Sequence, residues 1–433
     1  MLDIRRLNTS AKNFSVDLEA LTHWNEELSS DIEAAVKTVI AEVRSRGDTA
    51  VIEFTNRWDG RQVERFAELL VDADQLESAA RDIAPEQLEA LQNAAERIKD
   101  FHRRQLQDSW QYEDHLGNTL GQKVSAMGSA GIYVPGGKAA YPSSVLMNAI
   151  PAKVAGVRDI VMVSPAPSGD LNPAVLAAAH VAGVTSFYSV GGAQAIAALA
   201  YGTESVPRVD KIVGPGNAFV AAAKRMVFGQ VGIDMIAGPS EILVVGDGSV
   251  PPAWIAMDLL SQAEHDEQAQ AILISPDADY LDQVAIEIAK ALSTLERQAI
   301  ASQSIASKGA LIKVDCLQQA VELVNLIAPE HLELAVADPQ TLIEGIENAG
   351  AIFLGGFSPE AVGDYCAGPN HVLPTSATAR FSSPLGVYDF QKRSSIIGCS
   401  EQGGSELGKI ASVLARSESF TAHARSAEFR IKK

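Results

Sequence analysis

Apolar residues recur at helical spacing through much of the first hundred residues. Ser30 and Glu33 form a capping box in front of one such run and Gly47 follows it, so we expect a helix between them. A second helix is expected over residues 86–107, which are rich in Ala, Glu, Gln and Arg. This part of the chain predicts an outer helical layer with little chemistry of its own.

From about Gly131 the pattern changes to short apolar runs that alternate with helical segments. The strands of this series are expected at residues 159–163, 184–190 and 211–213, and its helices at residues 173–181, 193–201 and 218–227. Strands separated by helices of roughly 10–15 residues predict a parallel sheet built from βαβ units.

A second alternating series begins at Glu241. Its strands are expected at residues 241–245, 271–274, 310–314 and 351–354, with long helices at 254–268 and 281–301. We therefore expect two α/β domains that meet near residues 237–240, and we expect the second sheet to recruit the helical N-terminal part. A Gly-, Pro- and Ser-rich loop over 355–386 follows, and helices return at 410–415 and 420–426.

Charge and composition narrow the class of protein. The 433 residues carry 35 Lys and Arg against 54 Asp and Glu, a net charge of −19, which argues against a nucleic-acid-binding protein or electrostatic docking on anionic membranes. No apolar run approaches the ~20 residues of a membrane span, and the first ten residues contain no signal-peptide core. Three widely spaced cysteines predict no disulfide framework, so we expect a cytoplasmic protein.

Three glycine clusters lie at strand–helix junctions, at residues 131–137, 190–194 and 213–217. Glycine at such junctions lets backbone amides approach a phosphate, although none of the three has the GxGxxG spacing of a dinucleotide fingerprint. Each alone is typical of a tight βα turn. Three in one domain favour a nucleotide-sized ligand at the carboxyl ends of the strands.

Two histidine segments offer candidate chemistry. Gln262 and His265 are three apart on an expected helix and could share a metal, although a polar helix face is the commoner meaning of that spacing. Glu330 and His331 follow a proline and are candidates for proton abstraction and water activation, with a capping Glu beside a surface His as the alternative.

The long loop and the C-terminal tail hold further candidates. Asp364 offers a hard oxygen ligand, while Cys366 with His371 suggests a thiolate nucleophile and its base, for which no orienting Asn or Asp can be identified. Glu418 and His423 are five apart, which places them on different faces of a helix. From composition and spacing we expect a two-domain α/β enzyme with a metal and a nucleotide, and no particular reaction.

Taken in order, these segments resemble the histidinol dehydrogenase family. The matching motifs cover residues 131–137, 191–198, 214–219, 237–241, 261–265, 328–334, 363–375 and 418–423, and the resemblance extends from about residue 31 to 430. It implies oxidation of L-histidinol to L-histidine through L-histidinaldehyde with two NAD⁺, the last steps of histidine biosynthesis. It also implies two incomplete, Rossmann-like (aldehyde-dehydrogenase-like) parallel-sheet domains in a homodimer, with small helical N- and C-terminal segments exchanged between subunits.

The resemblance also gives domain boundaries. We expect an N-terminal helical segment (1–25), a discontinuous α/β domain (26–130 and 241–384), a second α/β domain with the NAD contacts (131–240), and a tail (385–433) that completes the partner subunit's site.

Site residues follow from the resemblance position by position. The zinc ligands are Gln262, His265, Asp364 and His423. The catalytic pair is Glu330, which would activate water, and His331, which would act as base. Besides the zinc ligands and His331, the substrate contacts are Ser240, His371 and Glu418. The NAD contacts are Tyr133, Gln194 and Asn217, one in each glycine-cluster segment.

Two other functions stay open. A paralogous zinc- and NAD-dependent dehydrogenase of another small polyol or sulfonated diol would share the Glu-His pair, but the presence of both His371 and Glu418 favours histidinol. A catalytically inactive, ligand-binding homologue is disfavoured by the intact catalytic and metal positions. Cys366 has no part in the implied mechanism.

Overall fold

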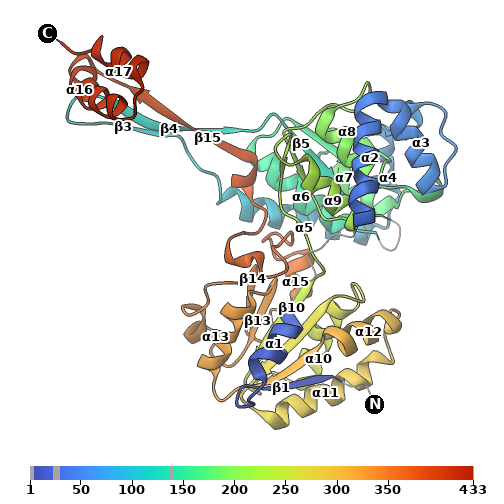
Figure 1. Cartoon of the computed structure of the whole chain (residues 1–433). Helices are drawn as coiled ribbons and strands as arrows, with labels where there is room; N and C mark the ends of the chain where they lie inside the picture. The colour runs from blue at the N-terminus through green and yellow to red at the C-terminus, as the bar shows by residue number, and fades with distance from the viewer. Residues whose placement is uncertain (1–3, 23–29, 137–139, 433) are drawn as a thin grey trace.

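Two six-stranded sheets and one three-stranded sheet organise the part of the chain that the structure describes. In this computed structural model, residues 4–22, 30–136 and 140–432 are described. Figure 1 shows three parts: one sheet with its helices, a second sheet with its helices, and a long projection that ends in the C-terminal helices. We refer to them as the β10 sheet, the β5 sheet and the arm.

The β10 sheet is entirely parallel. Its strand order is β1 (Arg5–Asn8), β12 (Ala310–Lys313), β11 (Gln270–Ser275), β10 (Glu241–Gly246), β13 (His331–Ala335) and β14 (Ala351–Leu354). Helices α10 (Pro252–Ala263), α11 (Ala278–Leu292) and α12 (Gln298–Lys308) pack on one face, and α1 (Phe14–Thr22) and α13 (Leu317–Ile327) pack on the other. The short helices α14 (Gln340–Ile343) and α15 (Glu360–Tyr365) flank β14 in the chain.

The β5 sheet repeats this topology. Its order is β2 (Leu70–Val71), β7 (Ser186–Tyr188), β6 (Asp159–Val163), β5 (Ser129–Tyr133), β8 (Lys211–Val213) and β9 (Gly232–Ile233), with only β2 antiparallel. One face is covered by α2 (Ser30–Arg46), α3 (Asp48–Asp59), α8 (Gly192–Tyr201) and α9 (Ala218–Val227). The other is covered by α4 (Ala73–Asp82), α5 (Pro85–Arg103), α6 (Pro142–Ala155) and α7 (Pro173–Ala182).

The expected grouping of residues 26–130 with residues 241–384 is wrong. The apolar faces of α2 to α5 are buried against the β5 sheet, where Val36 and Phe54 share a core with Ile196, and Leu76 and Ile98 share one with Met147. The N-terminal segment that joins the β10 sheet is instead the shorter stretch with β1 and α1, which adds a parallel edge strand beside β12.

The arm was not expected from the sequence. Strands β3 (Trp110–Glu113), β4 (Thr119–Ala126) and β15 (Gln391–Gly398) form an antiparallel sheet that leads to α16 (Glu401–Ser417) and α17 (Thr421–Glu428). Figure 1 shows the two helices at the tip of this arm, next to the C-terminus and far from the β10 sheet. In the described part of the chain, no helix has the length and apolar character needed to cross a membrane.

Candidate active site

The candidate site lies at the amino-terminal ends of β10 and β13, the two central strands of the β10 sheet. Glu241 begins β10, His331 begins β13, and Ile242 pairs with His331 in the ladder, so the two strand starts are adjacent. The loop before β13 carries Glu330, and both members of the expected catalytic pair are buried. The site thus occupies the edge opposite the carboxyl ends at which doubly wound sheets usually bind ligands.

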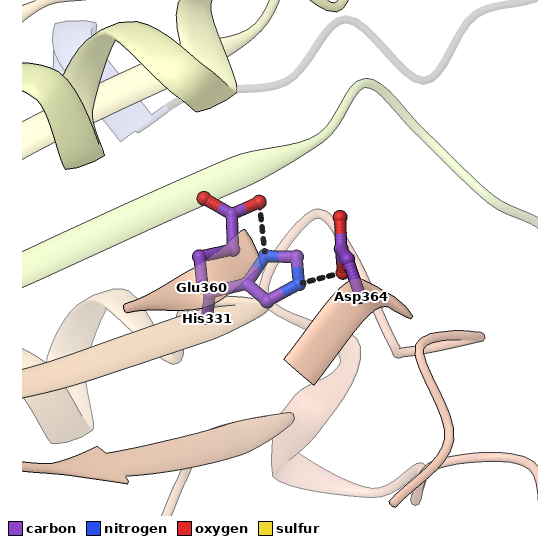
Figure 2. A group of neighbouring side chains, drawn as sticks. All are labelled: His331, Glu360 and Asp364. Carbon is purple, nitrogen blue, oxygen red and sulfur yellow. Dashed lines mark ion pairs between the residues drawn. The ribbon is translucent and has the colours of Figure 1, made fainter. Parts of the chain in front are cut away.

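His331 is held by one well-defined hydrogen bond. Its Nδ1 donates to the backbone carbonyl of Glu241 at 2.9 Å, whereas Nε2 is buried and has no hydrogen-bond partner among the described residues. Figure 2 shows the ring between two carboxylates from α15: Nδ1 lies 3.7 Å from Glu360 and Nε2 lies 3.6 Å from Asp364. Burial opposes a charged imidazole, but Glu360, Glu330 and Asp364 together raise the pKa of His331 well above its usual value.

The side chain of Glu330 points to the start of β10. Its carboxylate accepts a hydrogen bond from the backbone amide of Glu241 at 2.8 Å and lies 3.7 Å from Nδ1 of His331. Burial raises the pKa of Glu330 to about 7, a value suited to a group that takes and returns protons near neutral pH. Glu330 and His331 both contact Glu241, through its amide and its carbonyl.

The Gln262 and His265 segment ends α10 beside this group. The buried Gln262 amide, oriented with its nitrogen toward α15, donates to a carboxylate oxygen of Glu360 at 2.8 Å. His265 lies just beyond the end of α10, in the following turn and not inside the helix as expected. Burial lowers the pKa of His265, against the opposing charge of Asp364. Three of the four expected zinc ligands therefore come from two helix ends near His331.

The donor set fits a divalent cation. One ligand atom from each of His331, Glu360 and Asp364 lies within 4.8 Å of the others. Glu241 and Glu330 add two more buried carboxyl groups, and burial raises the pKa of Glu241 to about 8. A buried excess of carboxylates is a feature that a bound cation would satisfy.

The loop after α15 brings His371 to the site and connects it to the β5 sheet. Nδ1 of His371 donates to the backbone carbonyl of Asp364 at 2.9 Å, and Nε2 lies 3.3 Å from the hydroxyl of Ser144 on α6. With both ring nitrogens engaged, His371 has none left for Cys366, whose side chain is exposed. The structure thus gives no support to a thiolate nucleophile. Ser240 immediately precedes Glu241 at the start of β10.

Two expected site residues lie elsewhere in this chain. His423 is on α17 and Glu418 just precedes it, and both are exposed at the tip of the arm. Figure 1 shows that this tip does not reach the β10 sheet of its own chain. A single chain therefore does not bring them together with Asp364.

The expected NAD contacts gather at the carboxyl edge of the β5 sheet. Tyr133 ends β5, and its hydroxyl accepts a hydrogen bond from the Gly192 amide at 3.2 Å. Gln194, on α8, is buried with an unpartnered side-chain oxygen, and Asn217 caps α9 through the amides of Phe219 and Val220. β5 and β8 are the neighbours at which the strand order reverses, which is where such sheets bind ligands.

Sequence reasoning missed several residues of the site. Glu360 contacts both Gln262 and His331, and Glu241 contacts both members of the catalytic pair. Glu360 and Asp364 are four residues apart, so they share one face of a helix. That spacing was the one available signal.

Known proteins match this chain over nearly its whole length. The family model described as histidinol dehydrogenase matches residues 23–431. Histidinol dehydrogenases of Pseudomonas fluorescens (strain Pf-5) and Pseudomonas aeruginosa are 64% and 62% identical over 428 residues, which is 99% of this chain and 97% of each relative. The crystal structure of histidinol dehydrogenase from Elizabethkingia anophelis superposes with a TM-score of 0.93 at 34% identity, covering 99% of this chain and 98% of that one. The chain belongs to the histidinol dehydrogenase family.

Proposed function

We propose that this family member oxidises L-histidinol to L-histidine through L-histidinaldehyde with two NAD⁺, the final steps of histidine biosynthesis (EC 1.1.1.23), at the cluster around His331. The family assignment supports the reaction. The observation that carries the placement is the buried, unpartnered Nε2 of His331, which lies beside Glu330 and Asp364.

His331 acts as the base in the first oxidation. Nδ1 donates its proton in a hydrogen bond to the Glu241 carbonyl, so the lone pair of the neutral ring is on Nε2. The alcohol of the substrate can give up its proton to this nitrogen. NAD⁺, when bound, would supply the acceptor for the hydride of the same carbon. The role needs the neutral ring, and a cation bound at Asp364 would reduce the negative charge that favours the protonated ring.

Glu330 serves the second oxidation. Its carboxylate takes a proton from the water that adds to the aldehyde, and a second NAD⁺, when bound, would supply the acceptor for the second hydride. Its pKa of about 7 supports this role, because a carboxyl group whose pKa lies near neutral pH can both accept and release a proton.

Zinc would be held by Gln262, His265 and Asp364 of one chain together with His423 of a second chain. This nitrogen and oxygen set suits zinc, and the excess of buried carboxylates around it supports a cation there. When bound, the zinc would supply a fixed point for the imidazole and amine of the substrate. Ser240, His371 and Glu418 are the further substrate contacts, and Tyr133, Gln194 and Asn217 are the NAD contacts.

A homodimer with exchanged tails completes each site. Glu418 and His423 are exposed at the tip of the arm, as they would be if they act in a neighbouring subunit. The same tip leaves several large apolar side chains exposed: Ile397 (73%), Ile410 (59%), Val413 (69%), Leu414 (58%) and Phe429 (83%). Apolar groups gathered in this way are typical of a surface that a second subunit covers. The likeness to aldehyde dehydrogenases stays a prediction.

The proposal is tested by the NADH formed per L-histidinol consumed, before and after removal of metal with a chelator. Two NADH per histidinol, lost on chelation and restored by zinc, are expected. Turnover that survives complete removal of metal would refute the zinc assignment. Folded, zinc-loaded protein that forms no NADH from histidinol would refute the substrate and lead to a panel of other polyols and sulfonated diols.

A further inference from the structure

Glu333 is a buried carboxyl group two residues beyond His331. Side chains alternate across a strand, so Glu333 and His331 lie on the same face of β13, whereas Leu332 and Leu334 pack on the opposite face with α13. The carboxyl oxygen Oε1 of Glu333 accepts a hydrogen bond at 2.7 Å from the backbone amide of Glu360, the first residue of α15. The start of α15 is therefore attached to the strand that carries His331.

The same carboxyl group also contacts α10. The side chain of Asp258 lies beside that of Glu333, and Asp258 lies one turn before Gln262 on that helix. Burial and this neighbouring carboxyl group raise the pKa of Glu333.

Apolar contacts do little to fix α15. It has six residues, its N-cap Pro359 makes no side-chain capping bond, and only Glu360 and Gly363 are buried. Gly363 lies against the ring of Phe353 on β14, which sets the height of the helix above the sheet. An apolar face that would fix the start of the helix is missing, so the hydrogen bond from Glu360 to Glu333 has an important share in placing Asp364.

We propose that Glu333 is a positioning residue for the metal site. It joins the start of α15 to β13 and α10, so that Asp364, Gln262 and His331 converge on one point. The inference rests on the proposed function in one respect, namely that zinc binds at Gln262, His265 and Asp364.

The two contacts of Glu333 suggest a sharp experiment. Glu333 accepts a hydrogen bond from the Glu360 amide, and the side-chain oxygen of a glutamine can accept the same bond with nearly the same shape, while its amide nitrogen can donate to Asp258. Glu333→Gln should keep zinc affinity within about threefold of wild type, whereas Glu333→Met should weaken it by roughly 10- to 100-fold, as is usual when an outer partner of a metal ligand is lost. Zinc affinity is measured on the full chain by competition with a chelator.

A second readout does not depend on metal. Hydrogen exchange of the amides in residues 360–365 is followed in the zinc-free protein, where Glu333→Met should increase the exchange rate at least tenfold and Glu333→Gln should leave it unchanged. Ser304→Ala is the matched control, because it also removes one buried hydrogen bond near this sheet, to the carbonyl of Ala269, without touching α15.

The outcomes distinguish the positioning role of Glu333 from the proposed zinc site. Unchanged zinc affinity and unchanged exchange in Glu333→Met would overturn the positioning role. If wild type binds no zinc but the exchange rate rises in Glu333→Met, the attachment of α15 stands and the metal assignment fails. If Glu333→Met does not fold, Asp258→Leu replaces it, with an expected loss of about 3- to 10-fold in zinc affinity. Wild-type affinity in Asp258→Leu would then overturn the contact with α10.

Discussion

Nδ1 of His331 donates a hydrogen bond to the backbone carbonyl of Glu241 at 2.9 Å. A carbonyl can only accept, so the neutral imidazole must carry its proton on Nδ1 and keep the lone pair on Nε2. Because the partner is a backbone group, no side-chain substitution at position 241 can remove it directly. The start of β10 therefore fixes which nitrogen of His331 can act as base.

Replacement of His331 should test this arrangement. The amide nitrogen of an asparagine in His331→Asn can still donate to the Glu241 carbonyl, but the variant has no group in the place of Nε2. We expect kcat for NADH formation to fall by roughly 10²–10⁴, the range for loss of a general base, with KM changed much less. His180→Asn is the control, since His180 is exposed on α7. A kcat in His331→Asn above a tenth of wild type would contradict the role.

Exchange of the arm should be visible as complementation between two inactive variants. His331→Asn and His423→Ala would each inactivate both sites of their own dimer. Random mixed dimers would regain one intact site, so co-expression at equal levels should restore about a quarter of wild-type activity. Two separately tagged His331→Asn chains, co-purified, are the control and should stay inactive. If mixed dimers of the two variants are isolated and show no turnover, His423 does not act across the subunits.

Lys224 and Asp234 form a buried ion pair at the expected NAD edge, with side chains that are 3% and 1% exposed. Lys224 also donates to the Gly214 carbonyl at 2.9 Å, and the Gly214 amide donates to Asp234 at 2.8 Å. Lys224→Met should lower the free energy of unfolding by about 3–5 kcal/mol, because it leaves a buried carboxylate unpaired. Lys290→Met breaks an exposed pair with Glu287 and should change the free energy of unfolding by less than about 1 kcal/mol. Similar urea midpoints for the two variants would contradict this.

Gly363 should not tolerate a methyl group. A Cβ atom at this position would lie 2.5 Å from the ring of Phe353, so α15 would have to move away from the sheet together with Asp364. We expect Gly363→Ala to weaken zinc binding at least tenfold, and Phe353→Leu to restore part of the loss in the double variant. Gly404→Ala, whose new Cβ would meet nothing closer than 3.9 Å, serves as the control. Normal zinc affinity in Gly363→Ala would show that Asp364 does not depend on this contact.

His102 predicts a pH dependence of stability. It is fully buried on α5 and pairs with the carbonyl of Ile98 at 2.7 Å, and burial lowers its pKa. As pH falls below about 7, the unfolded chain binds a proton at this residue, with a pKa of ~6.5, before the folded chain does, so the free energy of unfolding decreases. His102→Gln should lack this pH-dependent contribution to the free energy of unfolding, so its urea midpoint should change less between pH 7.5 and 5.5. Parallel pH profiles for wild type and variant would contradict the assignment.

Much of the fold could be predicted from local patterns. The strand at 159–163 and the helix at 218–227 have the bounds expected for them, because each is a continuous buried or amphipathic run. The single helix expected over 281–301 is two helices, since α11 ends at Leu292 and α12 begins at Gln298. The strands of the arm were missed because β4 and β15 are partly exposed on both faces and carry no apolar alternation.

The candidate site was harder to predict, for a physical reason. β13 alternates His331 and Glu333 with Leu332 and Leu334, and its polar face is buried by partners from α10 and α15 that lie far away in the sequence. The motif therefore suggested a helix cap or an exposed pair, and the strand was not expected. The order of the sequence motifs indicated the family, but only the fold shows that Glu241, Glu360 and Glu333 surround the site residues in these motifs.

The arm has a consequence for synthesis of the chain. Ala126, which ends β4, precedes its partner Gln391 by 265 positions, so the hairpin of β3 and β4 leaves the ribosome long before β15 exists. At roughly 5–20 residues per second, one edge of β4 stays unpaired for about 13–50 s. Trp110 and Tyr112 are exposed on this hairpin, and an open strand edge beside aromatic side chains favours aggregation. We expect nascent chains to need a chaperone most during this interval, and truncation before residue 391 to produce insoluble protein.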